Sequence, residues 1–298
     1  FGFFCDMEKL KKLGILAPVS WESLGSPQFF GHLTSADPTT SSSSYMTYDL
    51  ILQNLKWDTG WETIFSLGAN VRGDFLHSSK KVLGHVHEDP QVACGVVIDY
   101  LFFLQREEFK PAEQKRYRYF LPKETGLFTA DPVAIVARAK NKEMAVRFID
   151  YLLSEGQHLL IKRKGHPLGP VDRGLHRLPV LRTLYSKDPG NEFYVNPFDL
   201  VSGVTFDPKV SAEKKALFSL LLKKGIVDNH DNLVKCARRA IDKKLVEKAL
   251  FRKVLPVTEK QFYVKVKELK TSNKLLWDRL QYVWNKHFHD AYNALYRK

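Results

Sequence analysis

The chain has 298 residues, of which 44% are hydrophobic and 12% aromatic, so it can bury the core of one or two domains and is not a disordered chain. No run approaches the roughly 20 apolar residues of a membrane-spanning helix. The three cysteines, Cys5, Cys94 and Cys236, show no short spacing. This excludes a Cys-x-x-Cys metal or redox motif and predicts no disulfide framework, with Cys94 as a buried structural thiol.

Charge is distributed unevenly along the chain. Residues 209–298 contain 22 of the 46 Lys and Arg but 9 of the 33 Asp and Glu, a difference of 13 that equals the net charge of the whole chain, +13. Such a basic block can bind nucleic acid or anionic lipid, or can form the solvated face of helices. Because its charges alternate with regularly spaced apolar residues, the pattern favours a solvated face.

The first expected element is a helix over residues 7–13 that ends at Gly14. A run of hydroxyl residues then follows the Asp37-Pro38 turn signal and leads into apolar residues at helical spacing from Tyr45 onward. Ser and Thr cap free amides at a helix start, and such a start can receive an anion or a small polar ligand. The candidate ligand-binding residues are Thr39, Thr40, Ser41, Ser42 and Ser43. The alternative is a surface loop that only caps the helix.

This helix is expected to end near Trp57, and Thr59 with Glu62 has the spacing of a capping box for a short second helix. Residues 92–98 form a continuous apolar run, which is typical of a strand buried in a mostly parallel sheet. Asp99 and Tyr100 follow it directly. Since ligands of open α/β sheets bind at the carboxyl ends of strands, both are candidate ligand-binding residues; the alternatives are a strand-end cap and a half-buried tyrosine.

A second buried strand is predicted over residues 132–137, followed by an amphipathic helix over residues 145–153 with Asn141 as its cap. From residue 211 the pattern is helical almost throughout, with a stop at Gly225. Alternating strands and helices followed by helices alone indicate an α/β body with a helical end.

Several segments, in a fixed order, point to one known family. They are Ser20-Trp21-Glu22-Ser23-Leu24, Asp37-Pro38-Thr39 with the serines, Gly60-Trp61, residues 92–100, residues 129–135 with residues 145–157, and Gly165-His166-Pro167-Leu168-Gly169-Pro170. Together they resemble the periplasmic solute-binding proteins of ABC importers, in particular the ferric-ion-binding and related families. The resemblance is continuous from residue 1 to about residue 185.

The resemblance implies an α/β, type II periplasmic-binding-protein fold: two lobes with crossing strands and a ligand between them. It also implies that roughly a hundred residues of the first lobe, the size of one domain, are missing before residue 1. Residues 1–20 and 126–190 would then belong to the first lobe and the crossing strands, residues 21–125 to the second α/β lobe, and residues 191–298 to a basic helical C-terminal region.

By the same resemblance, the chain would capture a small polar or anionic solute, either ferric iron or an organic or phosphorylated anion. Ferric-ion binders present two adjacent tyrosines where this chain reads Tyr100-Leu101, and Fe³⁺ needs several anionic oxygen ligands. Tyr100 would be a metal ligand only if the solute is Fe³⁺. No other cofactor is expected.

The resemblance further implies a monomer outside the cytoplasm, in the periplasm or at the outer side of the membrane, that delivers its solute to an ABC permease in the inner membrane. No motif of an enzyme is found, such as Gly-x-Ser-x-Gly, a phosphate-loop lysine or His-Glu-x-x-His. Two alternatives stay open. One is a basic module that binds nucleic acid or anionic membrane through residues 209–298, and the other is a decayed relative that binds no ligand.

Overall fold

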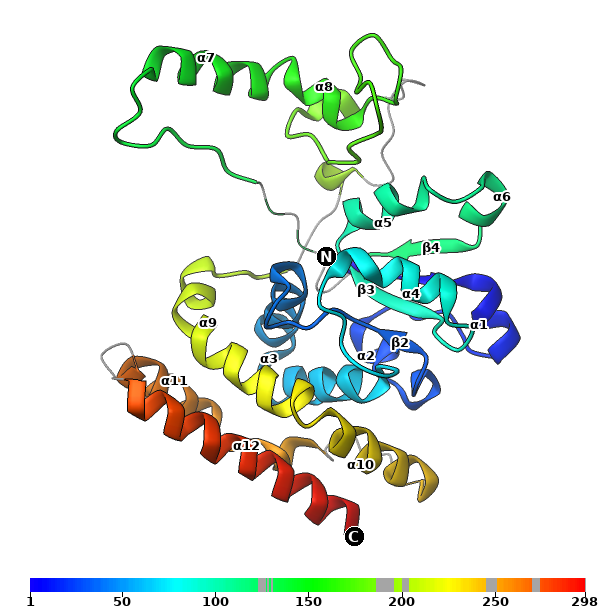
Figure 1. Ribbon diagram of the computed structural model, residues 1–298, viewed down its shortest axis with the longest axis vertical. Helices are drawn as coiled ribbons and strands as arrows, with labels where there is room; N and C mark the ends of the chain where they lie inside the picture. The colour runs from blue at the N-terminus through cyan, green and yellow to red at the C-terminus, as the bar shows by residue number, and fades with distance from the viewer. Residues whose placement is uncertain are drawn as a thin grey trace. The chain divides into compact units, whose positions relative to one another are not determined.

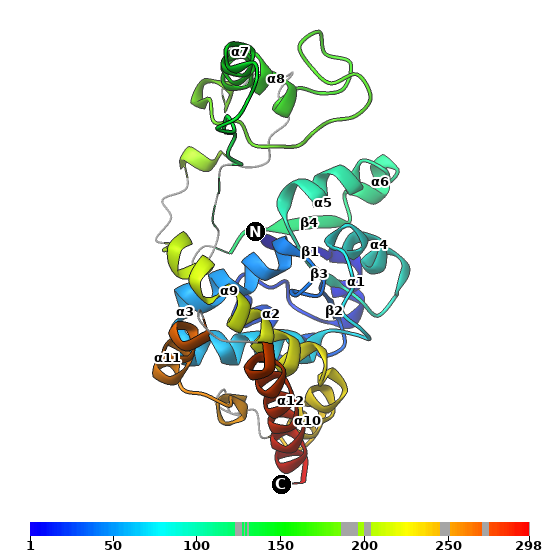
Figure 2. The same cartoon turned by 60° about the vertical axis from the view of Figure 1, so that its left-hand side comes forward.

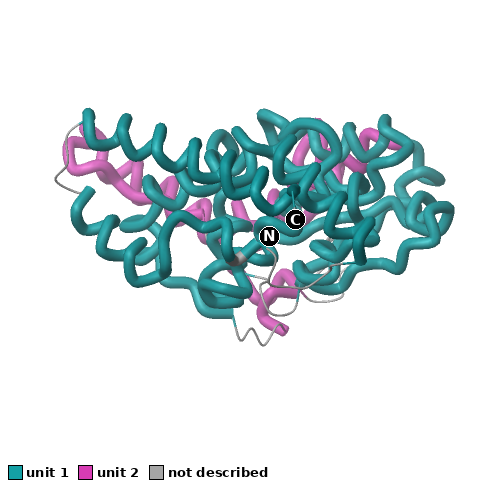
Figure 3. Tube along the Cα trace, turned by 90° about the horizontal axis from the view of Figure 1, so that it is seen from below, with its two compact units in different colours: residues 1–99, 110–127, 203–298 teal, residues 100–109, 128–202 magenta. Residues whose placement is uncertain are grey.

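A computed structural model describes residues 1–122, 127, 129, 131–185, 196–199, 204–244, 251–269 and 274–297 of the chain. These residues form two compact units (Figure 3). Unit 1 comprises residues 1–99, 110–127 and 203–298, and unit 2 comprises residues 100–109 and 128–202. The units do not coincide with the predicted lobes, whose boundaries stay a prediction. Within the described part of the chain, no helix is long and apolar enough to cross a membrane.

Unit 1 contains a four-stranded sheet, with α4 (Val82–Glu88) lying against it (Figure 1). Its strands are β1 (Gly2–Asp6), β2 (Leu33–Thr34), β3 (Cys94–Val97) and β4 (Tyr117–Phe120), in the order β2-β3-β1-β4. β2 is parallel to β3, whereas β1 is antiparallel to both β3 and β4. The strand predicted over residues 92–98 is confirmed, but the mostly parallel sheet is wrong. Both kinds of sheet can be buried on two faces, so the apolar run did not distinguish them.

A disulfide joins Cys5 on β1 to Cys94 on β3, with an S–S distance of 2.02 Å. The two residues are directly opposite each other in the antiparallel register. The prediction that the cysteines form no disulfide was therefore wrong. The partners are 89 residues apart, so only the pairing of β1 with β3 brings them together. Cys236, the remaining cysteine, is a buried free thiol.

Helix α1 (Met7–Leu13) follows β1 and ends at Gly14, as predicted. Asp6 begins the helix because its carboxylate accepts hydrogen bonds from the amides of Glu8 and Lys9 at 3.0 and 3.1 Å. Gly14 ends it with a φ of 69°, a left-handed conformation that favours glycine. The short helix α2 (Trp21–Leu24) and the 3₁₀ helix η1 (Pro27–Phe29) lead on to β2.

The hydroxyl run begins α3 (Ser42–Asn70), as predicted, with Ser41 as the capping residue. α3 consists of two helical segments separated at Lys56, which has φ 61° and ψ 174°. Two helices were expected here, but the capping box at Thr59 and Glu62 was wrong, since the second segment begins at Trp57. A 3₁₀ helix, η2 (Ser79–Lys81), then leads into α4 (Val82–Glu88).

The C-terminal helices pack onto α3 in unit 1 (Figure 2). They are α9 (Pro208–Leu222), α10 (His230–Asp242), α11 (Glu259–Leu269) and α12 (Lys274–Arg297), with the 3₁₀ helix η6 (Phe251–Val254) before α11. Aromatic side chains of α3, α9 and α12 share one core: Trp61, Phe65, Phe218, Phe288 and Tyr292. The helical C-terminal end is thereby confirmed, and it is not a detached basic arm.

The predicted helix stop at Gly225 was wrong. A π-helical turn (Lys223–Val227) carries the chain through this position. A Cβ atom at Gly225 would lie 3.1 Å from the Phe65 ring and 3.2 Å from the Phe288 ring. The glycine is therefore explained by close packing of the backbone against two aromatic rings and not by a helix end.

Unit 2 includes most of α5 (Asp99–Arg106), α7 (Lys142–Leu153) and α8 (Gly156–Ile161), with the 3₁₀ helices η3 (Arg182–Tyr185) and η4 (Pro197–Asp199). The helix α6 (Pro111–Gln114) belongs to unit 1. α7 confirms the predicted helix, since the Asn141 side chain accepts from the Met144 amide at 3.0 Å. Residues 132–137 form no strand, so that prediction was wrong. Periodicity does not separate a short apolar run in a strand from one in an extended loop.

Candidate functional site

The loop before α3 is held by Asp37. This carboxylate is 8% exposed, and one of its oxygens accepts hydrogen bonds from both the amide and the hydroxyl of Thr39, each at 2.7 Å. The amides of Thr40 and Ser41 bond the Asp37 carbonyl at 3.2 and 2.9 Å. Asp37 thus forms the tight turn predicted from Asp37-Pro38, and it directs the hydroxyl run toward the helix start.

Three serine hydroxyls meet at the first turn of α3. The Oγ atoms of Ser41 and Ser43 lie 2.7 and 2.9 Å from the Oγ of Ser79, and 3.2 Å from each other. We call these three residues the serine cluster. Ser41 is the capping residue of α3, so the cluster lies beside the free amides of the first helical turn. Thr40 and Ser42 are exposed next to it.

Ser79 was missed by the sequence analysis. It belongs to the segment Ser78-Ser79-Lys80-Lys81, in which both lysines are exposed. The Ser78 side chain accepts from the Lys80 amide at 3.3 Å and caps η2. Two hydroxyls followed by two lysines are a recognisable signal for anion binding. The sequence does not show that Ser79 contacts Ser41, because the two residues are 38 positions apart. The structure therefore adds a serine, and two cations adjacent to it in sequence, to the predicted hydroxyl run.

Asp99 lies where it was predicted, just beyond the carboxyl end of β3, and it is the first residue of α5. The hydroxyl of Tyr119 on β4 donates to the Val97 carbonyl at 3.2 Å. Burial, with a smaller effect of the Asp99 charge, raises the pKa of Tyr119 well above its usual range. This end of the sheet therefore carries a carboxylate near a neutral phenol that the sequence analysis did not identify.

Tyr100 belongs to unit 2, whereas the serine cluster and Asp99 belong to unit 1. The guanidinium carbon of Arg177 lies 3.5 Å from the centre of the Tyr100 ring, and Arg177 also forms an ion pair with Asp131 at 2.8 Å. A positive charge stacked on the ring makes this tyrosine a poor neighbour for a second cation. In the described part of the chain, no group of three or more His, Cys, Asp or Glu side chains could hold a metal ion.

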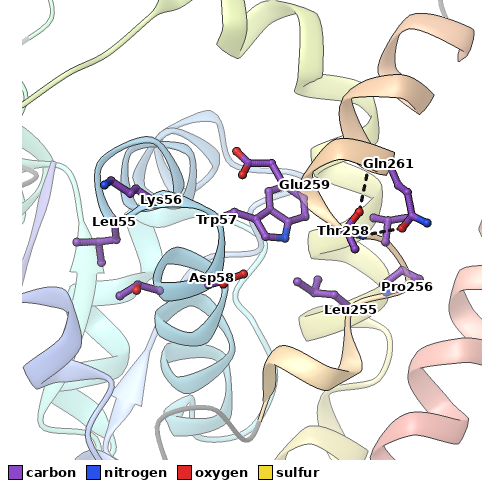
Figure 4. A pocket seen from close by; sticks show the side chains of 11 residues that line it. Leu55, Lys56, Trp57, Asp58, Leu255, Pro256, Thr258, Glu259 and Gln261 are labelled. Atoms are coloured by element: carbon purple, nitrogen blue, oxygen red, sulfur yellow. Dashed lines mark hydrogen bonds between the residues drawn. The ribbon is translucent and has the colours of Figure 1, made fainter.

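A separate hollow of about 600 Å³ lies at the break of α3 (Figure 4). Its lining includes Lys56, Trp57 and Asp58 on one side and Thr258 and Glu259 at the start of α11 on the other. Thr258 and Gln261 exchange hydrogen bonds of 2.9 and 3.3 Å at this start. Because two of the three charged residues in the lining are carboxylates, the hollow suits an anion less well than the serine cluster does.

Two curated proteins are similar to this chain. Each is a "phosphoglycerate transport regulatory protein PgtC", one from Salmonella typhimurium and one from Salmonella typhi. Both are 23% identical to this chain over 194 residues, which is 64% of this chain and 47% of the relative. The chain therefore spans about half the length of the curated relatives it matches.

Two solved structures are also similar. The periplasmic binding protein AfuA from Actinobacillus pleuropneumoniae, solved with exogenous fructose-6-phosphate bound, is 26% identical with a TM-score of 0.42, over 52% of this chain and 46% of that one. The periplasmic binding protein P5PA is 23% identical with a TM-score of 0.49, over 74% of this chain and 65% of that one.

Residues 1–176 match the family model described as bacterial extracellular solute-binding protein. This match covers more than half of the 298 residues and confirms the predicted α/β solute-binding class. It is a class of binding proteins and not of enzymes. The chain belongs to the bacterial extracellular solute-binding protein family.

Proposed function

We propose that this chain is part of the solute-binding component of an ABC import system, and that its solute is a small phosphorylated organic anion. The observation that carries the proposal is the serine cluster at the start of α3, where three hydroxyls lie within 3.2 Å of one another. Hydroxyls and the free amides of a helix N-terminus can together donate to phosphate oxygens. Lys80 and Lys81, adjacent to Ser79 in sequence, would add positive charge.

In this proposal Thr40, Ser41, Ser42 and Ser43 supply donors to the phosphate. Thr39, whose amide and hydroxyl both donate to Asp37, would shape the loop that holds them. Asp99 would contact the rest of the solute, because a carboxylate repels phosphate but accepts hydrogen bonds from hydroxyl groups. Tyr100 stays a contact predicted from the sequence. The curated relatives, named for phosphoglycerate transport, support a phosphorylated solute. The cation stacked on Tyr100 and the acid-free serine cluster favour this solute over Fe³⁺.

Binding would shift an equilibrium between open and closed arrangements of two lobes, and the closed form would be recognised by a permease. We propose a monomer that works outside the cytoplasm, in the periplasm or at the membrane, in agreement with its extracellular family.

Isothermal titration calorimetry of the full chain tests this proposal, with 3-phosphoglycerate, fructose 6-phosphate, inorganic phosphate and ferric citrate as separate probes. The decisive variant is Ser43→Ala with Ser79→Ala, which removes two hydroxyls but keeps Ser41 as the cap of α3. Loss of two hydrogen bonds of about 1 kcal/mol each lowers affinity roughly tenfold or more. Lys80→Ala with Lys81→Ala also weakens binding.

The matched controls are Ser66→Ala with Ser219→Ala, and Lys11→Ala with Lys12→Ala, which make the same chemical changes away from the serine cluster. They leave affinity unchanged. Binding of ferric citrate alone, or organic phosphate binding that the serine cluster variant does not weaken, would show that this proposal is wrong.

A further inference from the structure

Helix α12 is apolar on two opposite faces. Its inner face is buried in the core of unit 1, where Trp284, Phe288 and Tyr292 are 2%, 0% and 0% exposed. Its other side carries large apolar residues in solvent: Leu275 is 76% exposed, Leu276 46%, Tyr282 71% and Val283 48%. A surface helix whose outer side only faces solvent has polar residues on that side. The outer apolar residues therefore require an explanation of their own.

Two cations are interleaved with these apolar residues. Leu275, Arg279, Tyr282 and Lys286 follow one another at intervals of three or four positions, so they share one side of the helix. Lys286 is 62% exposed and pairs with Asp290, one turn further on, at 2.7 Å. We call Leu275, Leu276, Arg279, Tyr282, Val283 and Lys286 the outward face of α12.

The outward face of α12 is exposed from Leu275 to Lys286. In unit 1, α12 runs along the side away from the sheet, with α10 beside it (Figures 1 and 2). Residues 209–298, which include these helices, carry 22 basic against 9 acidic residues. An approaching surface therefore meets a helix with exposed apolar side chains in a strongly basic part of the chain.

We propose that the outward face of α12 binds an anionic lipid surface. The apolar side chains would enter the boundary between headgroups and acyl chains, with the helix axis parallel to the membrane. Tyrosine is suited to this depth because its ring is apolar and its hydroxyl stays wet. Arg279 would extend its charged end to lipid phosphates while its alkyl stem remains among the apolar residues. Lys286 would exchange its exposed ion pair with Asp290 for a lipid phosphate.

Nucleic acid fits this face less well. Phosphate backbones are bound by cations and hydrogen-bond donors, and neither leucine nor valine contributes to such contacts. Four exposed apolar residues beside two cations match a lipid interface more closely than a phosphate chain. This inference goes beyond the proposed solute binding, since it concerns a different surface and does not depend on the serine cluster.

Vesicle flotation of the full chain tests the proposal. One set of vesicles contains phosphatidylcholine alone, and the other mixes it with the anionic lipid phosphatidylglycerol. We expect binding to the anionic vesicles that weakens with salt. Arg279→Glu with Lys286→Glu lowers the partition coefficient roughly tenfold or more. Leu275→Ser with Tyr282→Ser lowers it to a similar extent, about tenfold.

Two matched controls accompany these variants. Lys260→Glu with Lys267→Glu makes the same charge change on α11, and Met144→Ser with Phe148→Ser removes exposed apolar residues from α7. Both leave vesicle binding within about twofold. All the changed side chains are exposed, and thermal unfolding checks that each variant is folded.

Three results would overturn the proposal: no binding to anionic vesicles, binding that the apolar pair does not affect, or equal losses in the control variants. A parallel titration with duplex DNA and single-stranded RNA separates the alternative. Nucleic acid binding that is stronger than vesicle binding and depends on the cations but not on Leu275 and Tyr282 would also overturn it.

Discussion

Asp49 on α3 and Lys214 on α9 form an ion pair with both side chains withdrawn from solvent. The Nζ and Oδ1 atoms are 2.6 Å apart, and the side chains are 0% and 1% exposed. The Ser211 hydroxyl donates to the second carboxylate oxygen. This contact fixes the C-terminal helices to the helix that begins at the serine cluster. A buried pair of this kind specifies an arrangement more than it stabilises the fold.

We predict that Asp49→Asn destabilises the protein by about 3–5 kcal/mol, because it leaves the Lys214 ammonium buried without its counter-charge. Asp49→Leu combined with Lys214→Met replaces both charges by apolar groups and costs much less, within about 2 kcal/mol of the original chain. Urea unfolding followed by circular dichroism measures both. A double variant less stable than the single one would contradict this account.

The disulfide predicts a defined count of reactive thiols. With Cys236 buried and Cys5 bonded to Cys94, we expect almost no reaction of the native protein with a thiol reagent. One thiol reacts after unfolding, and three react after unfolding with reductant. Three thiols in the unfolded protein without reductant would disprove the bond.

Cys5→Ala with Cys94→Ala is expected to lower the free energy of unfolding by about 4 kcal/mol. The bond closes a loop between residues 89 positions apart, and such a loop restricts the unfolded chain by roughly that amount. Urea unfolding gives the difference. Cys236→Ala serves as the control, since it removes a thiol without opening a loop.

Lys9, on α1, caps the C-terminal end of α4 with its side chain. Its ammonium donates to the carbonyls of Asp89 and Val92 at 2.7 and 3.3 Å, and also to the Val86 carbonyl. Lys9→Met keeps the length of the side chain but leaves these oxygens without their donor, so we expect a loss of about 2–3 kcal/mol. Lys11→Met, on the exposed side of α1, changes the free energy of unfolding by less than about 0.5 kcal/mol. Equal effects of the two variants would contradict the role of Lys9.

His230 predicts a dependence of stability on pH. Its Nε2 lies 2.9 Å from the Gly68 carbonyl, and burial lowers its pKa below the usual value. The unfolded chain, with the ordinary pKa of about 6.5, therefore binds a proton more readily than the folded protein. The contribution of His230 to the free energy of unfolding is fully present above about pH 6.5, the pKa in the unfolded chain. It is lost as the pH falls toward the lowered pKa of the folded protein.

We expect stability to decrease between about pH 7 and pH 5, and to decrease less steeply in His230→Gln, which keeps a donor near the Gly68 carbonyl. Urea unfolding at several pH values measures the slope, and the proton NMR titration of the His230 ring gives its pKa directly. A pKa at or above that of a free histidine would contradict this prediction.

Elements built from local sequence were predicted well. The helix that ends at Gly14, the helix capped by Asn141 and the helix start at the hydroxyl run each depend on residues within one or two turns. Capping and periodicity act over that range, so the sequence shows them directly. Asp99 at the end of β3 was found for the same reason, because a strand and the residue after it are contiguous.

Features that join distant segments were missed. The antiparallel pairing of β1 with β3, the disulfide and the contact of Ser79 with Ser41 each link residues at least 38 positions apart. No local pattern records such a pairing, since the register of a sheet is set by the packing of whole strands. Of the candidate site, the hydroxyl run could be predicted and its partner serine could not.

The position of β1 affects how the chain folds. The first strand is an inner member of the sheet, between β3 and β4, yet these partners are residues 94–97 and 117–120. During synthesis β1 is therefore made long before either neighbour exists, since β3 begins at residue 94 and β4 at residue 117. Such non-local pairing slows folding and leaves the apolar residues of β1 exposed to non-native association. Residues 2–6 therefore have to stay unpaired until the second strand of the β1–β3 pair has been made.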